Sequence, residues 1–434
     1  MTGPAAPSER PDRRARGSLA ALLTAHAVSQ TGNVVTAFAI PFYVLGTGGS
    51  GTDVGLAAFF ATAPIVLGGT LGGVVVDRVG PRRAAIVADL ASGVTVLAIP
   101  VAAQTVGLPF WALLLLVFAG GLLDTPGQTA RRVLLPRLSA RAGVRLEQSV
   151  GLLDGSERLA RLLGASAAGL LVALLGPVAS LYVNAEAFAL SALLTRALVV
   201  VPPAPGIAEG VDAGDREGAG DRAPTRASYW ADLADGVRFL VRDRLLRAVI
   251  ALVLVTNLLD AARSSTLLPL YADDRLGGAA ALGLLVAVLG GSALIGNVAF
   301  GAVAHRLPRR VTFSICFALA GAPSSAALAL GAPLPLLVAA FALSGLAAGS
   351  INPILGAVQL ERIPEHLRGR VFGLVNAGAW AGVPLGALLG GVAADTVGLA
   401  VAFGAIAALY ALITLSPLTG GTWRQMERGA SDPR

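Results

Sequence analysis

The sequence predicts an all-α membrane protein of twelve transmembrane helices, built from two six-helix units that repeat in the same orientation. Hydrophobic residues make up 55% of the 434-residue chain and charged residues only 14%, whereas soluble domains carry about 25% charged residues. The apolar residues gather in runs near the ~20 residues that a helix needs to cross a bilayer. A pattern of glycine, proline and arginine from the first half of the chain recurs in the second.

The predicted transmembrane helices are the long apolar runs. They cover residues 18–45, 54–76, 84–104, 109–130, 148–175, 178–200, 245–271, 279–304, 311–331, 334–358, 370–394 and 398–419. The expected organisation is an N-terminal tail (1–17), a first bundle (18–200), a linker (201–243), a second bundle (244–419) and a C-terminal tail (420–434).

The internal repeat is visible at a nearly constant offset. An offset of 228 positions relates Gly73 to Gly301, Arg78 to Arg306, Arg82 to Arg310, Pro41 to Pro269, Tyr43 to Tyr271 and Gly55 to Gly283. Later in each unit the offset is 222, which relates Gly169 to Gly391, because a loop of the first half is six residues longer. Parallel repeats of six helices are a known transporter design.

A short charged tip, residues 73–83, separates the second and third apolar runs. We expect Gly73 to let a neighbouring helix approach closely and Gly80 to permit the tight reversal. The arginines of the tip mark the cytoplasmic side, since basic residues favour that side of a membrane. They do not account for Asp77, an acid at the membrane boundary.

The Gly-x-x-x-Asp-Arg-x-Gly-x-Arg-Arg pattern of this tip resembles the loop 2–3 signature of the major facilitator superfamily. The resemblance covers about residues 18–419, and it implies the major facilitator fold and alternating access. We expect Asp124 to end the fourth helix near the cytoplasm. The resemblance implies gating roles for this acid and for residues of the tip: Gly73, Asp77, Arg78, Gly80, Arg82 and Asp124. Asp124 would pair with the tip arginines in one transport state, and Asp77 would contact the start of the eleventh helix.

Four further segments narrow the resemblance to one group within the superfamily. They are residues 161–164, residues 229–240, the Leu-Pro-Leu-Tyr motif at 268–271 and residues 363–371, and they resemble bacterial drug exporters of the macrolide-efflux type and related siderophore exporters. This similarity implies export of a small molecule, with a substrate that differs between relatives.

The arginine distribution predicts the orientation. The even-numbered connections between helices are rich in arginine, whereas the odd-numbered connections contain only Arg275. Both termini and the linker are therefore expected on the cytoplasmic side of the cell membrane. Residues 202–227 have the composition of a disordered linker, and residues 228–243 have the apolar stripe of a helix lying on the membrane surface, or else extend the seventh helix.

An acid in the seventh predicted helix is the first candidate for chemistry. Asp260 lies about fifteen residues into that helix, near the bilayer midplane at ~1.5 Å per residue. Asn257, Asp260 and Ser264 share one helix face, and Arg263 is within one turn of the acid. A charged residue at this depth is costly and indicates a function. We interpret Asp260 as a proton or cation site whose pKa Arg263 adjusts, the alternative being an ion pair that only fixes helix packing.

The first predicted helix carries His26, Gln30 and Asn33 on one face, which suits hydrogen bonding to a substrate in an apolar cavity or packing between helices. Glu186 in the sixth helix is a second candidate for proton uptake. Glu157 and Arg161 form an i,i+4 pair that we interpret as structural.

The leading function hypothesis is a secondary active transporter that exports amphipathic small molecules in exchange for protons, as a monomer in the bilayer. A uniporter or importer of a metabolite and a lipid flippase are the alternatives. The chain has no Gly-x-x-x-x-Gly-Lys-Ser/Thr motif, so ATP drive within it is not expected, and no nucleophile–base arrangement indicates an enzyme. No cofactor or metal is expected, since the three histidines are scattered. The net charge of +7 does not indicate nucleic-acid binding, because the arginines punctuate the apolar runs.

The orientation gives a first testable prediction. A cysteine at position 219, in a chain whose native Cys316 is replaced by alanine, should resist a membrane-impermeant thiol reagent in intact cells and react after the membrane is opened. Labelling in intact cells would place the linker outside and reverse the predicted topology.

Overall fold

The first half of the chain forms six long helices in the computed structural model, which describes residues 13–200 and 226–427. They are α1 (Arg13–Gly46), α2 (Gly51–Val79), α3 (Pro81–Thr105), α4 (Phe110–Ala142), α5 (Leu146–Leu175) and α6 (Pro177–Leu198). Each is one uninterrupted helix, and short turns join them. Gly80 has a φ of 86° between α2 and α3, a conformation that glycine adopts without strain.

The second half is also helical, but several of its spans are broken. Its elements are α7 (Arg226–Arg242), α8 (Arg244–Ala261), the π-helix η1 (Ala262–Leu267), α9 (Leu268–Arg275), α10 (Ala279–Val303), η2 (Ala304–Arg306), α11 (Arg309–Ala329), α12 (Leu334–Ala348), α13 (Ile351–Arg362), η3 (Glu365–Leu367), α14 (Arg368–Trp380), α15 (Val383–Val397), α16 (Leu399–Leu415), η4 (Ser416–Leu418) and η5 (Thr422–Met426). The seventh, tenth and eleventh predicted helices thus correspond to α8–η1–α9, α12–α13 and α14–α15.

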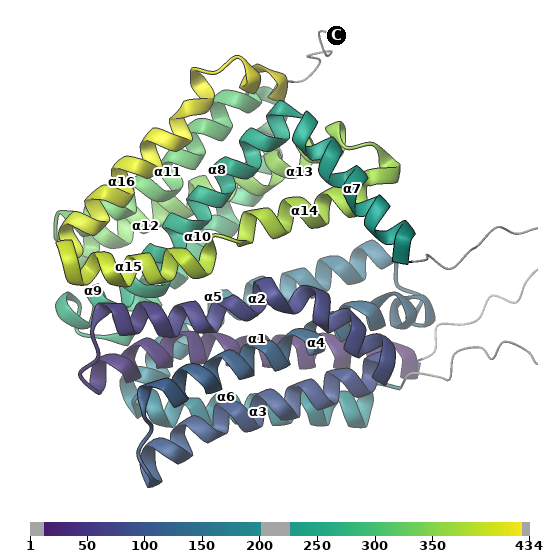
Figure 1. Ribbon diagram of the computed structural model, residues 1–434, viewed down its shortest axis with the longest axis vertical. Helices are drawn as coiled ribbons and strands as arrows, with labels where there is room; N and C mark the ends of the chain where they lie inside the picture. The colour runs from purple at the N-terminus through teal and green to yellow at the C-terminus, as the bar shows by residue number, and fades with distance from the viewer. Residues whose placement is uncertain (1–12, 201–225, 428–434) are drawn as a thin grey trace, which may run out of the picture.

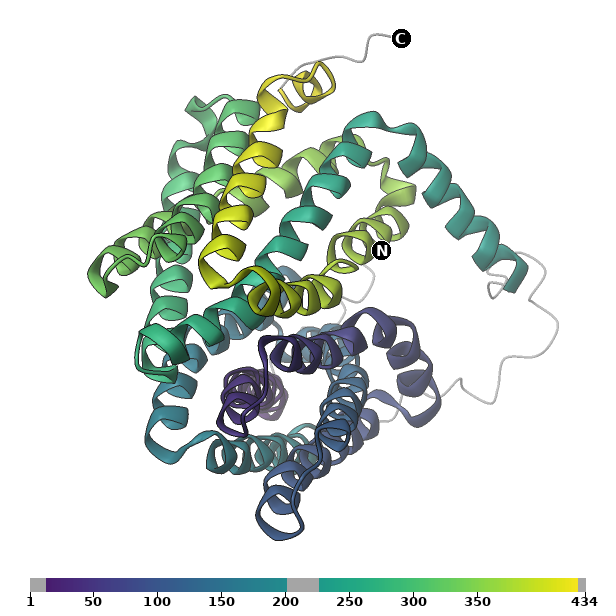
Figure 2. The same cartoon turned by 60° about the vertical axis from the view of Figure 1, so that its left-hand side comes forward.

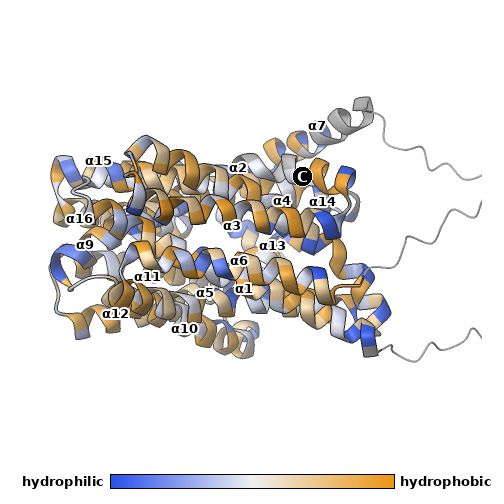
Figure 3. Ribbon diagram, turned by 90° about the horizontal axis from the view of Figure 1, so that it is seen from below, coloured by the Kyte–Doolittle hydropathy of each residue, from blue (hydrophilic) through white to orange (hydrophobic). Residues whose placement is uncertain are grey.

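The expected all-α membrane fold is confirmed. Within the described residues, eleven helical stretches are long and apolar enough to span a bilayer, and the 29-residue α2 is the twelfth long element of the bundle. Large apolar side chains such as Val94, Leu174 and Leu412 are exposed on the outer surface. Figure 3 shows hydrophobic residues along the helices and hydrophilic residues mainly at the two ends.

The helix α7 covers most of the segment in which a membrane-surface helix is predicted. Its side chains Val237 and Val241 are 41% and 54% exposed, as expected for a helix that rests on an apolar medium. Most of the predicted disordered linker, residues 202–225, lies outside the described residues.

The two halves approach each other at one end of the molecule and diverge toward the other (Figures 1 and 2). We call the first end, which holds the α1–α2, α9–α10 and α15–α16 turns, the sealed end. The opposite end holds the α2–α3, α4–α5 and α10–α11 turns together with most of the arginines, and we call it the arginine-rich end.

Glycines bring the backbones of the two halves into contact at the sealed end. A Cβ atom added to Gly55 of α2 would lie 2.9 Å from the carbonyl oxygen of Ala387 in α15. On the opposite side of the molecule, a Cβ atom added to Gly283 of α10 would lie 2.8 Å from the carbonyl oxygen of Ala165 in α5. Larger side chains at these positions would separate the helices, as in other close contacts between membrane helices.

These two contacts, which we call the inter-half seams, are equivalent under the internal repeat. Gly55 corresponds to Gly283, and Gly391, which packs against Gly55 in the first seam, corresponds to Gly169, which packs against Gly283 in the second. The repeat therefore supplies both partners of both seams.

One seam also carries a polar contact between the halves. Asp395 at the end of α15 accepts hydrogen bonds from the backbone N–H groups of Gly51 (2.9 Å) and Thr52 (2.7 Å) and from the Thr52 hydroxyl (2.6 Å). A carboxylate is favourable beside a helix N-terminus, because the free N–H groups there carry partial positive charge. The other seam has alanine at the position equivalent to Thr52, Ala280.

The seams give a second prediction. Replacing Gly283 with leucine should weaken closure at the sealed end, since overpacking a tight contact costs about 1–3 kcal/mol. Val106 and Leu330 are each 85% exposed and lie in opposite halves at that end. Spin labels attached at these two positions should be further apart on average in the variant, as measured by pulsed electron paramagnetic resonance.

The matched control is Gly301→Leu in the same helix, where an added Cβ atom meets nothing within 4 Å. Equal distance distributions in both variants would show that the glycine contact does not determine closure.

Candidate functional site

The predicted pair of Asp260 and Arg263 exists and belongs to a larger polar cluster in the second half. Arg263 Nη2 donates a hydrogen bond to Asp260 Oδ1 at 3.1 Å, and the hydroxyl of Tyr410 in α16 donates to Asp260 Oδ2 at 3.2 Å. Arg263 Nη1 donates to Ser324 Oγ in α11 at 2.8 Å, and its guanidinium carbon lies 5.9 Å from the centre of the Phe341 ring in α12. Both oxygens of the acid therefore have donors, and the cation has a polar and an aromatic partner.

The two charges differ in their access to the surface. The Arg263 side chain is only 7% exposed, whereas the Asp260 side chain is 37% exposed. Tyr410 and Ser324 are buried. The carboxylate is thus the member of the cluster that a proton or a polar ligand reaches first.

The π-helix η1 positions this cluster. It begins directly after α8, and the Leu268 N–H group bonds to the carbonyl oxygen of Arg263, five residues earlier. Pro269, which follows, has no N–H group and clashes with the carbonyl four residues before it in a regular α-helix. Single π turns within longer helices are frequent at functional sites.

The two predicted neighbours of Asp260 have other partners. Asn257 Nδ2 donates to the carbonyl oxygen of Ala379 in α14 at 2.7 Å. The Ser264 hydroxyl donates to the backbone carbonyl of Asp260 at 2.6 Å and is exposed. Asn257 therefore connects α8 with α14, whereas the exposed Ser264 hydroxyl bonds only within its own helix among the described residues.

In the first half, the predicted face of α1 is polar and largely buried. Asn33 Nδ2 donates to Asp124 Oδ2 at 2.9 Å, and Gln128 Nε2 donates to the same oxygen at 2.7 Å. Gln30 is 8% exposed and lies on the same helix face. Asp124 is thus bound to α1 through the side-chain amide of Asn33 and to its own helix through that of Gln128.

The predicted place of Asp124 at the end of the fourth helix was wrong. The helix α4 continues to Ala142, twelve residues beyond the predicted end at 130, so Asp124 lies near its middle. The described structure shows the acid bound to Asn33 and Gln128, and it shows no contact of Asp124 with Arg78 or Arg82.

His26 belongs to a different group, near the arginine-rich end. Its Nε2 atom lies 3.9 Å from Glu157 Oε2, and the histidine is 1% exposed. Arg161 Nη2 contacts Glu157 Oε1 at 2.5 Å, the predicted i,i+4 pair, and Arg132 lies 3.5 Å from Oε2. His26 therefore adjoins an ion-pair network, which sequence spacing alone did not indicate.

The residues of the charged tip are separated from the second half. Asp77 and Arg78 are exposed, and Arg82 Nη2 donates to the carbonyl oxygen of Arg196 in α6 at 2.6 Å. The expectation of close helix packing at Gly73 is not met here, since an added Cβ atom would meet nothing within 4 Å. Glu186 is exposed on α6, away from the other candidates.

One buried ion pair was missed by the sequence analysis. Arg131 Nη2 lies 2.5 Å and 2.6 Å from the two carboxylate oxygens of Asp89, and Ser191 Oγ lies 2.7 Å from Asp89 Oδ2 and 3.0 Å from the Ala25 carbonyl oxygen. Asp89, Arg131 and Ser191 are fully buried. The group connects α3, α4, α6 and α1. Asp89 is the single acid in the third apolar run. It could have indicated this ion pair from the sequence, because an acid in a membrane helix needs a buried partner.

Within the described residues, no three His, Cys, Asp or Glu side chains gather closely enough to hold a metal ion.

Comparison with known proteins agrees with the geometry. The sequence profile of the Major Facilitator Superfamily matches residues 22–279 and 250–424. The multidrug efflux pump Tap of Mycolicibacterium fortuitum is 32% identical over 391 residues, which cover 89% of this chain and 92% of that protein. The multidrug efflux pump Tap of Mycobacterium tuberculosis (strain ATCC 25618 / H37Rv) is 32% identical over 397 residues, 90% of each chain.

Solved structures share the fold at low sequence identity. A crystal structure of the nucleoside transporter NupG superposes with a TM-score of 0.67 at 13% identity, over 92% of this chain and 98% of that one. A bacterial homologue of the iron transporter ferroportin has a TM-score of 0.64 at 16% identity, over 93% and 98%. The profile match and the Tap relatives, together with the twelve long helices in two repeated units, establish that the chain is a multi-pass membrane transporter, not an enzyme, and belongs to the Major Facilitator Superfamily.

Proposed function

We propose that the chain exports amphipathic small molecules from the cytoplasm in exchange for protons, by alternating access of its two halves. The observation that carries the proposal is the Asp260 cluster. It is a partly exposed carboxylate held between Arg263 and Tyr410 at a π turn within a membrane span. The relatives named as multidrug efflux pumps support the substrate class.

The orientation of the molecule supports export. The protein would lie in the cell membrane. The positive-inside rule would place its arginine-rich end and both termini on the cytoplasmic side. The halves contact each other at the sealed end, so this conformation suits entry of a substrate from the cytoplasmic side. Opening the inter-half seams and closing the arginine-rich end would then expose the site to the other side, as in related transporters built from two rocking halves.

Proton exchange would act through the charge of Asp260. When the carboxylate is ionised, it holds Arg263 and Tyr410 at its two oxygens. Protonation removes that charge and weakens the ion pair with Arg263, so the two states favour different positions of α8 and η1. Gln30, Asn33, Asn257 and Ser264 would supply neutral polar contacts for a substrate, whereas His26, predicted as a fifth contact, is buried beside Glu157. Glu186 is the alternative site of proton uptake.

The coupling role gives a third prediction. Asp260→Asn keeps the size of the side chain but cannot change charge, so it should abolish proton-driven accumulation of substrate while leaving downhill equilibration intact. Purified protein in vesicles with an imposed pH gradient gives this measurement for a panel of amphipathic drugs, with and without a protonophore.

The matched control is Asp274→Asn, an exposed acid in the same span whose one ion pair among the described residues is with its neighbour Arg275. If Asp260→Asn still accumulates substrate against a gradient, Asp260 is not the coupling site, and Glu186→Gln becomes the next variant. Transport by the unaltered protein that ignores the proton gradient would favour a uniporter, and movement of labelled phospholipid alone would favour a flippase.

The charged tip gives a fourth prediction. Asp77 is exposed and, among the described residues, makes no ion pair in this conformation, so Asp77→Asn should leave folding and membrane insertion unchanged. If the tip contacts α14 when the arginine-rich end closes, the variant should slow transport by about 5- to 150-fold, the usual range for a coupling free energy.

Initial transport rates, measured beside the control Asp273→Asn at the sealed end, test this role. A normal transport rate in Asp77→Asn would show that Asp77 has no role in gating. Loss of folded protein would show that Asp77 is needed for the structure.

A further inference from the structure

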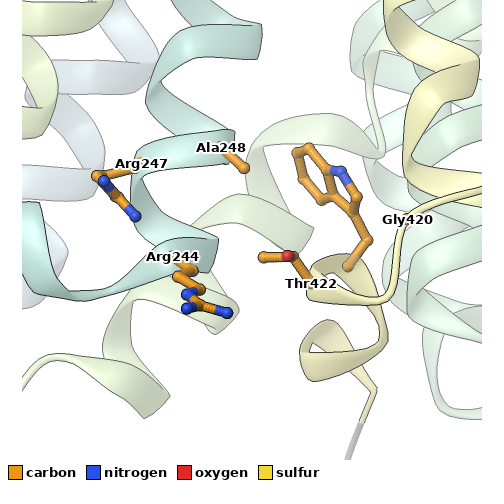
Figure 4. Close-up of a pocket in the computed structure, with 6 residues that line it drawn as sticks. Arg244, Arg247, Ala248, Gly420 and Thr422 are labelled. Carbon is orange, nitrogen blue, oxygen red and sulfur yellow. The ribbon is translucent and has the colours of Figure 1, made fainter.

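A pocket of 440 Å³ lies between the start of α8 and the C-terminal segment that follows α16. Arg244, Arg247 and Ala248 line one wall, and Gly420, Thr422 and Trp423 line the other. Figure 4 shows the two guanidinium groups on the α8 side, with the Thr422 hydroxyl and the indole ring across from them. The pocket is remote from the Asp260 cluster, which lies about four turns further along α8 and η1.

The two arginines of this pocket lack acceptors. Neither guanidinium forms an ion pair or hydrogen bond within the part of the chain that the structure describes, and both side chains are exposed. The adjacent acid, Asp243, is already engaged: it accepts from the Leu246 N–H group at 2.9 Å and from Arg362 Nε at 2.9 Å. The pocket therefore presents positive charge that is not paired with any carboxylate of residues 13–200 and 226–427.

Two other arginines at the same end of the second half are engaged. Arg309 forms two hydrogen bonds with Glu361, at 2.5 Å and 2.7 Å, and Arg310 donates to the carbonyl oxygens of Pro417 and Leu418. Arg244 and Arg247 point at the pocket instead.

The position of the pocket is at the membrane boundary. The seventh span begins at Arg244, and α7, with Val237 and Val241 exposed, approaches the same point. Trp423 is 8% exposed, and its ring stacks on Phe313 of α11 with centroids 6.3 Å apart. Tryptophan is enriched at the level of lipid headgroups, and basic pockets between membrane helices on the cytoplasmic side bind anionic headgroups.

We propose that this pocket binds the phosphate of an anionic phospholipid from the cytoplasmic leaflet. The two guanidinium groups would each offer paired N–H donors to phosphate oxygens, the Thr422 hydroxyl would donate a further hydrogen bond, and Ala248 and the indole would contact the glycerol and the first acyl carbons. A bound lipid would connect the first span of the second half to the C-terminal segment. The proposal does not depend on the transported substrate.

Native mass spectrometry of the full-length protein, with phosphatidylglycerol or phosphatidylcholine added in detergent, tests it. Phosphatidylglycerol should bind more tightly than phosphatidylcholine. Arg244→Gln together with Arg247→Gln should weaken phosphatidylglycerol binding about thirty-fold, because each arginine near a membrane surface contributes ~1 kcal/mol. The matched control, Arg137→Gln with Arg158→Gln, removes two exposed arginines of the first half and should bind as the unaltered protein does.

Three results would overturn the proposal. Unchanged binding in the Arg244 and Arg247 variant would exclude the pocket, and an equal loss in the control would show attraction by net charge alone. Full competition by glycerol phosphate at equal concentration would identify a site for free phosphate esters in place of a lipid.

Discussion

Contact of backbone against backbone along α15 connects the two halves to each other and to the polar cluster. On one side, Gly391 packs against Gly51 and Gly55 of α2. On the other side, Gly386 and Gly390 pack against the carbonyl oxygens of Leu258 and Ala262, directly beside the acid and cation of the cluster. Because protein interiors are close-packed and transmit displacement, a movement of α2 away from α15 changes the surroundings of α8 and η1. The contact at the sealed end and the surroundings of Asp260 therefore share one glycine-lined helix.

The two halves differ in how firmly their own helices are held. In the first half all six helices are continuous, and the buried group of Asp89, Arg131 and Ser191 joins four of them. Removing one partner of such a pair leaves an uncompensated buried charge, which costs about 3–5 kcal/mol in proteins. In the second half three spans are interrupted, at η1, between α12 and α13, and between α14 and α15. The first half therefore consists of continuous helices tied by a buried ion pair, whereas the second half contains three interrupted spans.

The sequence predicted features that depend on near neighbours along the chain. The spans followed from the length of the apolar runs, and the Asp260–Arg263 pair followed from a spacing of three on one helix face. Contacts between distant segments were not predicted: Tyr410 lies 150 positions from Asp260, and Arg131 lies 42 positions from Asp89. The position of Asp124 was wrong for a different reason. The prediction ended the helix with its apolar run, whereas the hydrogen-bonded helix continues through the arginine-containing residues that follow, to Ala142.

The π turn has a consequence for the internal repeat. Beyond η1 the offset between the units is 228 positions, as for the buried pairs Pro41 with Pro269 and Tyr43 with Tyr271. Before η1 the burial patterns of α1 and α8 coincide at an offset of 227, at Leu19 with Leu246, Leu22 with Val249, Ala25 with Leu252, Ser29 with Thr256 and Gly32 with Leu259. A turn closed by a bond to the fifth residue back holds one residue more than a regular turn, so η1 accommodates a single extra residue in the second unit.

With that residue counted, Gln30 and Asn33 of the first unit are equivalent to Asn257 and Asp260 of the second. The two units then carry polar side chains at the same two positions of their first helices, and they differ in where the negative charge lies. The second unit has its carboxylate at one of these positions, and the first has an amide there that reaches across to the carboxylate of Asp124 on the neighbouring helix.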